Sequence, residues 1–181
     1  SIEVKKGKVL EVLAQNTNNP LERSVYKAKE YVCNMDPKQT ASMIGIEHFS
    51  KDVRKRLSYQ YSPSNFMIYA VVSGVDLKEL GFGKWNNFHS CDIDLNKSFR
   101  KMYYDFNYSS PSFALCSPTL MTEDNSDCPS DRYLVEILTV ANYNYFKRLK
   151  ITDIKKYKEA KSYIYNSILD VVEKEYIPNF R

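Results

Sequence analysis

Glycine is scarce in this sequence, with five residues in 181. The nearest approach to a phosphate-binding loop is Gly81-Phe82-Gly83, and Asn86 stands where the pattern G-x-G-x-x-G needs its third glycine. That pattern cradles a pyrophosphate because glycine lets backbone amides approach it at the start of a helix. No helix-like run follows Gly83, so we interpret the segment as a turn and expect no dinucleotide site in this chain.

Histidine and cysteine are also few. The two histidines, His48 and His89, have no second metal ligand at helical or turn spacing, which argues against a zinc site. His89 remains a candidate for either a catalytic acid or base, or a hydrogen-bonded structural residue. The cysteines are widely spaced and form no C-x-x-C pair, which favours reduced thiols over disulfides. They are Cys33, Cys91, Cys116 and Cys128.

Long apolar runs and a strong excess of one charge are absent as well. No segment reaches the roughly 18–20 apolar residues of a membrane-spanning helix. The net charge is +4, and the basic residues are interspersed with acidic ones, so we expect no nucleic-acid partner. The hydrophobic fraction of 43% is typical of a globular domain. Tyrosine, by contrast, is abundant at 15 residues, and its flat apolar ring with a polar tip suits a pocket wall.

The N-terminal quarter predicts a hairpin, a further strand and a helix. Residues 2–4 and 9–12 are strand-like and flank a turn at residues 6–8, and residues 16–20 read as a loop. We expect the next strand over 26–34. Asp36 and Pro37 then suit the N-cap and first turn of a helix that ends at Gly45.

The remainder predicts strands and helices that are mixed but do not strictly alternate. The unbroken apolar run Phe66–Val72 predicts a central strand buried on both faces. We expect a helix over 94–104 with Asp94 as its N-cap, and a long amphipathic helix beginning at Thr152. The short link between strands 65–75 and 87–93 favours antiparallel pairing between them. Further strands are predicted at 113–117 and 133–140, with a polar loop at 121–131.

These elements predict an α+β fold, with a mixed, largely antiparallel sheet and helices packed on one side. The order of several short motifs resembles the middle of the phytoene desaturase superfamily, which includes carotene isomerases and retinol saturase-like enzymes. The motifs that carry this resemblance are Gly7-Lys8-Val9-Leu10-Glu11-Val12, Tyr31-Val32-Cys33-Asn34-Met35-Asp36-Pro37, Trp85–Asp94, Ser112–Thr119, Tyr157–Lys161 and Glu173–Pro178.

The resemblance implies an internal fragment of a FAD-dependent oxidoreductase. Residues 1–44 would be a remnant of the FAD-binding domain, comprising a hairpin, a strand and a helix. Residues 45–181 would form the substrate-binding domain. The flavin fingerprint and the C-terminal flavin motif of the family are both missing here. We therefore expect FAD in the parent protein but none in this segment, which would be inactive when isolated.

The implied substrate is a polyene or another hydrophobic isoprenoid, which would be desaturated, saturated or isomerised. Such an enzyme supplies an apolar slot, and the flavin supplies the redox step. We expect one wall of that slot to consist of five residues, although each of them could equally be ordinary core. They are Phe66, Ile68, Phe88, Phe113 and Ile137. The catalytic residues are not predicted. Asp92 and Asp94 could share a strand face, but Asp94 better suits the N-cap role.

The expected partners are the hydrophobic polyene or lipid substrate and the remainder of the parent chain. Peripheral membrane contact is a further expectation, in a protein that is cytoplasmic or membrane-associated. If strands 2–12 and 30–34 lack partners, their exposed edges favour a homodimer through edge-strand pairing. Two alternatives stay open: a non-enzymatic α+β binding module, and a carrier of hydrophobic ligands.

Overall fold

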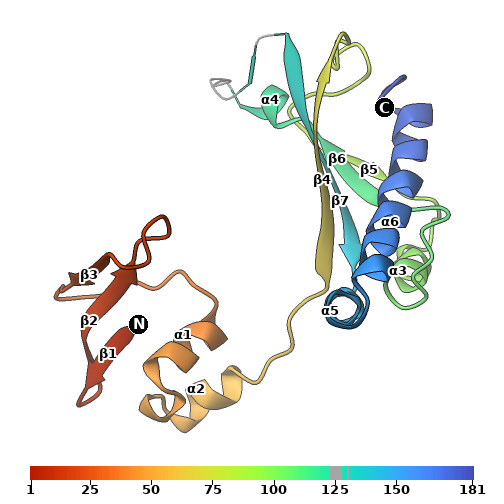
Figure 1. The fold of residues 1–181 in the computed structure, drawn as a ribbon. Coiled ribbons are helices and arrows are strands. Elements are labelled where there is room, and N and C mark those ends of the chain that lie inside the picture. Colours follow the sequence, from red (N-terminus) through yellow and green to blue (C-terminus); the bar gives the residue numbers. More distant parts are fainter. Residues whose placement is uncertain (123–127, 130) are drawn as a thin grey trace. The chain divides into compact units, whose positions relative to one another are not determined.

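The computed structural model describes residues 1–122, 128, 129 and 131–181 (Figure 1), so most of the predicted loop at 121–131 lies outside the described residues. The chain divides into two compact units, residues 1–61 (unit 1) and 62–181 (unit 2). This division falls later than the predicted boundary after residue 44. Two contacts hold residues 59–61 to unit 1: Tyr61 donates a hydrogen bond to Asp36 (2.9 Å), and Lys38 donates one to the Tyr59 carbonyl oxygen.

Unit 1 begins with a three-stranded antiparallel sheet. Its strands are β1 (Ile2–Lys5), β2 (Lys8–Gln15) and β3 (Arg23–Tyr26), in the order β1-β2-β3. Lys6 and Gly7 form the turn between β1 and β2, with φ angles of 51° and 72°. Two successive left-handed residues make a hairpin turn whose twist matches that of the strands. The predicted hairpin is therefore confirmed.

The prediction of a strand over residues 26–34 is wrong. The strand ends at Tyr26, and residues 30–34 form no ladder; Val32 is 98% exposed. The Tyr31 hydroxyl instead donates a hydrogen bond to the Leu10 carbonyl oxygen (2.9 Å), which attaches this segment to β2. Residues 27–30 are Lys-Ala-Lys-Glu, so Ala28 is the only apolar side chain with which the segment could continue β3. Strand β1 pairs with β2, and β2 pairs on its other side with β3, so neither β1 nor β2 lacks a partner.

The first helix follows the capping signals in the sequence. Helix α1 (Pro37–Ile44) starts after Asp36, whose side chain accepts a hydrogen bond from the Gln39 amide (2.9 Å). It ends at Gly45, which has a φ of 102°. A short 3-10 turn, η1 (Ile46–His48), and helix α2 (Lys51–Arg56) complete unit 1.

Unit 2 is built on a four-stranded antiparallel sheet, and the α+β class is confirmed. The strands are β4 (Ser64–Ser73), β5 (Asn87–His89), β6 (Phe113–Cys116) and β7 (Arg132–Ala141), in the order β4-β7-β6-β5. The expected pairing of β4 with β5 is wrong, because these strands lie at opposite edges. Strand β4 instead pairs with β7 along ten residues, a longer ladder than the three residues of β5 could form.

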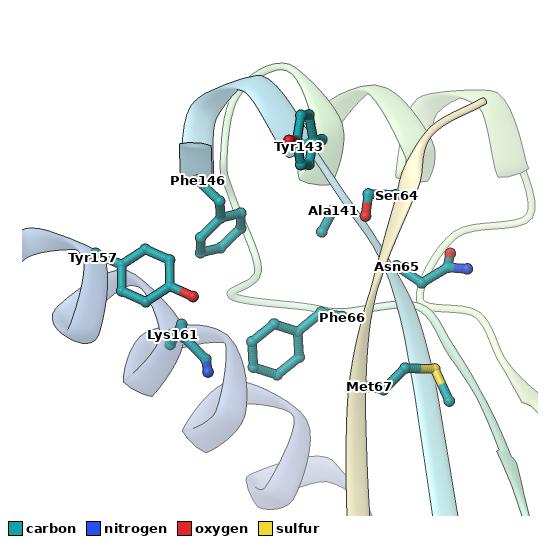
Figure 2. Close-up of a pocket in the computed structure, with 9 residues that line it drawn as sticks. All are labelled: Ser64, Asn65, Phe66, Met67, Ala141, Tyr143, Phe146, Tyr157 and Lys161. Atoms are coloured by element: carbon teal, nitrogen blue, oxygen red, sulfur yellow. The ribbon is translucent and has the colours of Figure 1, made fainter. Parts of the chain in front are cut away.

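Four helices accompany this sheet: α3 (Leu95–Tyr103), α4 (Pro118–Met121), α5 (Tyr143–Thr152) and α6 (Ile154–Glu175). Asp94 caps α3 as predicted, and its side chain accepts hydrogen bonds from the amides of Asn96 and Lys97. The prediction of Thr152 as the N-cap of the last helix is wrong, since Thr152 is the last residue of α5. Asp153 caps α6 and accepts a hydrogen bond from the Lys156 amide (3.0 Å). Helices α5 and α6 meet the start of β4 around a small pocket (Figure 2).

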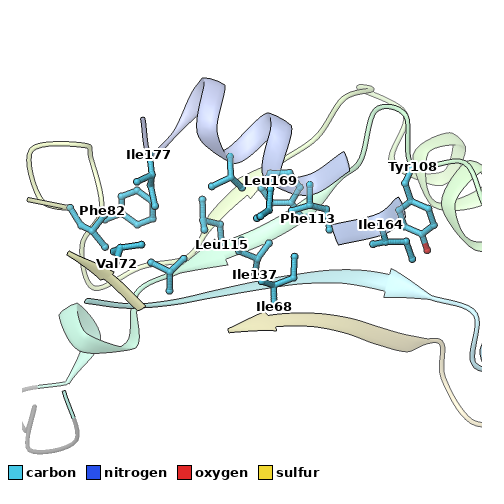
Figure 3. Packing of buried hydrophobic residues seen from close by; sticks show 14 of the residues in the cluster. Ile68, Val72, Phe82, Tyr108, Phe113, Leu115, Ile137, Ile164, Leu169 and Ile177 are labelled. Carbon is cyan, nitrogen blue, oxygen red and sulfur yellow. The ribbon is translucent and has the colours of Figure 1, made fainter. Parts of the chain in front are cut away.

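The core of unit 2 lies between α6 and one face of the sheet (Figure 3). The buried residues of α6 are Ala160, Ile164, Ile168, Leu169 and Val172, which lie on one side of the helix. The predicted stripe included Ile164, Ile168 and Val172, but Ile154 at its start is 55% exposed. Strand β4, however, is not buried on both faces. Ile68 and Val72 lie in the core, whereas Tyr69 and Val71 on the opposite face are 68% and 57% exposed.

Candidate functional site

The face of the sheet that points away from α6 carries an apolar row across all four strands. Phe88 of β5 lies opposite Ala114 of β6, Ala114 lies opposite Leu138 of β7, and Leu138 lies opposite Met67 of β4. Directly paired residues share a face, and four strands at about 4.8 Å spacing give a row about 14 Å across. Phe88 is 78% exposed, and the other three are half-buried. We call these four residues the open row.

A second row on the same face is more polar. Cys116 lies opposite Glu136, and Glu136 lies opposite Tyr69. Glu136 is the charged residue in the middle of this face. Burial, and after it the negative charge of Glu136, raises the pKa of the Cys116 thiol, so this thiol is protonated at neutral pH.

Helix α3 forms a wall beside the open row. Leu95, Phe99 and Met102 follow one another at spacings of four and three residues, which places them on one side of the helix. Together with Ala114 and Leu138 they line a groove of about 430 Å³. That volume is within the range of pockets that hold small molecules. The groove is therefore an apolar surface of ligand size.

The five residues predicted as one wall do not share a surface. Phe66, Ile68, Phe113 and Ile137 lie on the side that α6 covers, where Ile68, Phe113 and Ile137 are at most 6% exposed. Phe88 alone lies on the open face. The reason is the two-residue period of a strand, because Phe88 pairs with Ala114 and not with Phe113. Ile68, Phe113 and Ile137 are instead core residues, which was the alternative interpretation.

His89 lies on the covered side of β5. Its Nδ1 is 3.1 Å from the Tyr176 hydroxyl, and its ring stacks on Phe113 with 4.9 Å between centroids. Partial burial lowers the pKa of His89, and the nearby charge of Glu175 opposes that shift. A neutral imidazole held by α6 and the sheet has a structural role here, away from the open row.

The two aspartates also have separate structural roles. Strand β5 ends at His89, so Asp92 and Asp94 do not share a strand face. Asp92 pairs with Lys97 at 2.8 Å, and this hydrogen bond is the main reason that the pKa of Asp92 is lowered. Asp94 caps α3. Neither carboxylate is placed for acid or base chemistry at the open row.

The described residues contain no group of three or more histidine, cysteine, aspartate or glutamate side chains that could hold a metal ion. Over the same part of the chain, none of the helices combines the length and the apolar character needed to cross a bilayer. All four cysteines have free thiols.

Sequence reasoning missed most of the open row. Met67 and Ala114 are flanked by apolar residues on both sides, and Leu138 follows the apolar Ile137, so the sequence pattern does not separate the two faces at these positions. Only the register of the ladders distinguishes them. The helical spacing of Leu95, Phe99 and Met102 was a usable signal for the wall beside the row.

No protein-family model matches this chain, and neither the curated proteins nor the solved structures contain a match to it.

Proposed function

We propose that unit 2 is the substrate-binding domain of a FAD-dependent oxidoreductase that desaturates, saturates or isomerises a polyene or another hydrophobic isoprenoid. The observation that supports this most is the open row, an apolar strip that crosses the whole sheet on the face opposite α6. The order of the sequence motifs supports the same family.

The chemistry of such a substrate fits this face. A polyene has almost no polar groups, so its binding depends on the apolar area removed from water. Each 100 Å² of that area contributes about 2.5 kcal/mol before the entropy cost of binding is subtracted. Phe88 and Phe99 at the edge of the groove add flat rings, against which a conjugated chain stacks favourably.

The described residues do not fit FAD itself. The segment Gly81-Phe82-Gly83 leads into β5 instead of a helix, and Phe82 is 3% exposed within the core. The Trp85 ring lies against the backbone of Gly83, where a pyrophosphate would have to approach. We therefore assign FAD to the remainder of the parent chain and derive no redox step within this segment. The role of these residues is to bind the substrate and to exclude water.

In this proposal, unit 1 belongs to the FAD-binding part of the parent protein. Its outer strands, β1 and β3, are the edges of a three-stranded sheet. Such edges are ready to pair with further strands, which belong to the parent chain or, in the isolated segment, to a second copy. Peripheral membrane contact of the parent protein remains part of the proposal.

A stand-alone carrier of hydrophobic ligands fits the groove less well. Sites that retain a small molecule bury most of its surface. Here Phe88 is 78% exposed and Leu95 is 67% exposed, so the groove is open along one side. An open wall fits a slot that a second domain completes.

The test is to sequence the gene on both sides of the region that encodes these residues, and to express the whole reading frame. We expect a G-x-G-x-x-G motif upstream, and a purified protein with the visible absorption bands of oxidised flavin. A reading frame without that motif, or a folded product without flavin, would contradict the proposal.

A further inference from the structure

A second site lies at the opposite side of β4 from the open row, where the start of this edge strand faces α5 and α6. Figure 2 shows the rings of Phe66, Phe146 and Tyr157 around the space between these three elements. The cavity has a volume of about 260 Å³. The rings of Phe146 and Tyr157 are perpendicular, with 6.0 Å between their centroids. The walls are therefore aromatic and come from three different elements.

Lys161 supplies a positive charge at this pocket. Its ammonium group lies 5.7 Å from the centre of the Tyr157 ring. Among the described residues, no carboxylate lies within ion-pair distance of it. Its neighbours one helical turn away are Tyr157, Lys158, Ile164 and Tyr165, none of which is acidic. The charge of Lys161 is thus left uncompensated by its own helix.

The surrounding sequence reinforces the positive potential. Residues 143–161, which form α5 and the first part of α6, contain seven lysines and arginines but only two acidic residues. Lys155 pairs with Glu159 and Lys156 with Asp153, and Lys161 is the charged residue that lines the cavity. Its positive charge, within a segment of net positive charge, raises the local concentration of counter-ions. The pocket thus favours an anionic ligand.

A neighbouring hollow continues past Lys161. It has a volume of about 340 Å³ and shares Phe66, Met67 and Lys161 with the first cavity, while Tyr69 and Tyr165 form its far wall. Lys161 therefore stands between two partly apolar spaces along the edge of β4. A ligand bound here can contact the ammonium group with a charged end and place apolar groups on the rings.

From this geometry we infer that the Tyr157–Lys161 pocket binds a small amphipathic anion, with a carboxylate or phosphate group attached to a flat apolar body. The Lys161 ammonium contacts the oxyanion, the Tyr157 hydroxyl donates a hydrogen bond to it, and Phe66 and Phe146 hold the apolar body. This site goes beyond the proposed function, because Phe146, Tyr157 and Lys161 of α5 and α6 line neither the open row nor the α3 groove. Of the open row it touches only Met67, and of the groove only Asn65.

The experiment is a calorimetric titration of the 181-residue chain with 2-naphthoate and phenyl phosphate, and with the neutral 2-naphthamide for comparison. We expect saturable binding of at least one anion, and at least tenfold weaker binding of the amide. Lys161→Gln removes the charge but keeps most of the side-chain length. It should weaken anion binding at least tenfold, because a hydrogen bond to a charged group is lost.

Two control variants define the site. Lys158→Gln removes a lysine one turn earlier that does not line the pocket, and it should change the affinity less than twofold. Tyr104→Phe, at an exposed ring that does not line the pocket, should also leave anion binding unchanged. Equal losses in Lys161→Gln and Lys158→Gln would show only a general attraction to a basic surface. That result, or the absence of saturable binding by both anions, would overturn the inference.

Sedimentation with phosphatidic acid vesicles distinguishes a lipid headgroup from a soluble ligand. If the natural ligand is a lipid, the apparent affinity for the vesicles should be at least tenfold weaker in Lys161→Gln than in Lys158→Gln. If it is soluble, the titrations still show the dependence on Lys161, and sedimentation is equal in both variants. Circular dichroism of each variant confirms that the fold is retained.

Discussion

Ile68 of β4 lies directly opposite Ile137 of β7, and both side chains point toward α6. One residue along the same ladder, Met67 lies opposite Leu138 on the other face. Because successive side chains of a strand point to opposite faces, this register determines on which face of the sheet each side chain lies. One face packs against α6, and the other carries the open row on which the proposed function depends.

The first prediction tests this division with two neighbouring residues. Ile137 is fully buried and Leu138 is half-buried. We expect Ile137→Ala to lower the free energy of unfolding by about 2–5 kcal/mol, because it leaves a cavity under α6. Leu138→Ala should cost no more than about half as much. Urea unfolding measures both. A greater loss in Leu138→Ala would reverse the assignment of the two faces.

The second prediction concerns Tyr108, which is fully buried in the loop after α3. Its hydroxyl donates a hydrogen bond to the Val140 carbonyl oxygen (2.8 Å). Tyr108→Phe keeps the ring but removes the donor, and we expect a loss of about 1–2 kcal/mol in unfolding free energy. Tyr104→Phe is the matched control, since Tyr104 is 70% exposed and should change stability by less than about 0.5 kcal/mol. Equal effects would show that the Tyr108–Val140 bond contributes nothing.

The third prediction is a pH dependence that arises from His89. Burial lowers the pKa of His89 below its ordinary value of 6.5, so the unfolded chain binds a proton at a higher pH than the folded chain does. Stability therefore rises with pH between the folded and unfolded pKa values, and it falls on acidification below about pH 6.5. His89→Gln should reduce the change in the midpoint temperature of thermal unfolding between pH 7 and pH 5.

His48→Gln is the control for that measurement, because His48 lies in unit 1. Thermal unfolding followed at several pH values gives the slope for each variant. If His48→Gln flattens the profile of unit 2 as much as His89→Gln does, the assignment to His89 is wrong.

The fourth prediction concerns the junction between α5 and α6. The Asp153 carboxylate accepts a hydrogen bond from the Lys156 backbone amide, and this backbone hydrogen bond is the main cause of the lowered pKa of Asp153. Asp153→Ala should cost about 1 kcal/mol, as is usual for the loss of an N-cap. Thr152→Ala should cost less, because Thr152 only bonds back to the Arg148 carbonyl oxygen. The reverse order in urea unfolding would place the cap at Thr152.

Capping residues and tight turns could be predicted from the sequence because their chemistry is local. The interactions of these residues involve backbone groups at most three positions away, so a short stretch of sequence is enough to identify them. The examples are Asp36, Asp94 and the turn at Lys6-Gly7. The start of α6 was misplaced by one residue because Thr152 and Asp153 are both suitable caps, and the preceding helix α5 was missed.

Strand pairing could not be predicted in the same way. The partners of β4 lie about 60 to 77 residues away in β7, and no local pattern distinguishes them from the nearer β5. The candidate site depends on that pairing. Phe88 was selected as a single aromatic residue, but its neighbours on the open row, Ala114, Leu138 and Met67, come together only through three ladders.

The most direct test of the account is a fluorescence titration of the chain with retinol, a fluorescent isoprenoid polyene, using Leu138→Lys and Ile151→Lys. Ile151 is 76% exposed on α5, so its substitution adds the same charge away from the open row. We predict saturable binding that Leu138→Lys weakens at least roughly tenfold, since a lysine placed under an apolar ligand must lose its water. The Ile151→Lys variant should bind retinol with the same affinity as the unmodified chain. Equal affinities in the two variants, or no saturable binding, would contradict the claim that this face binds a hydrophobic substrate.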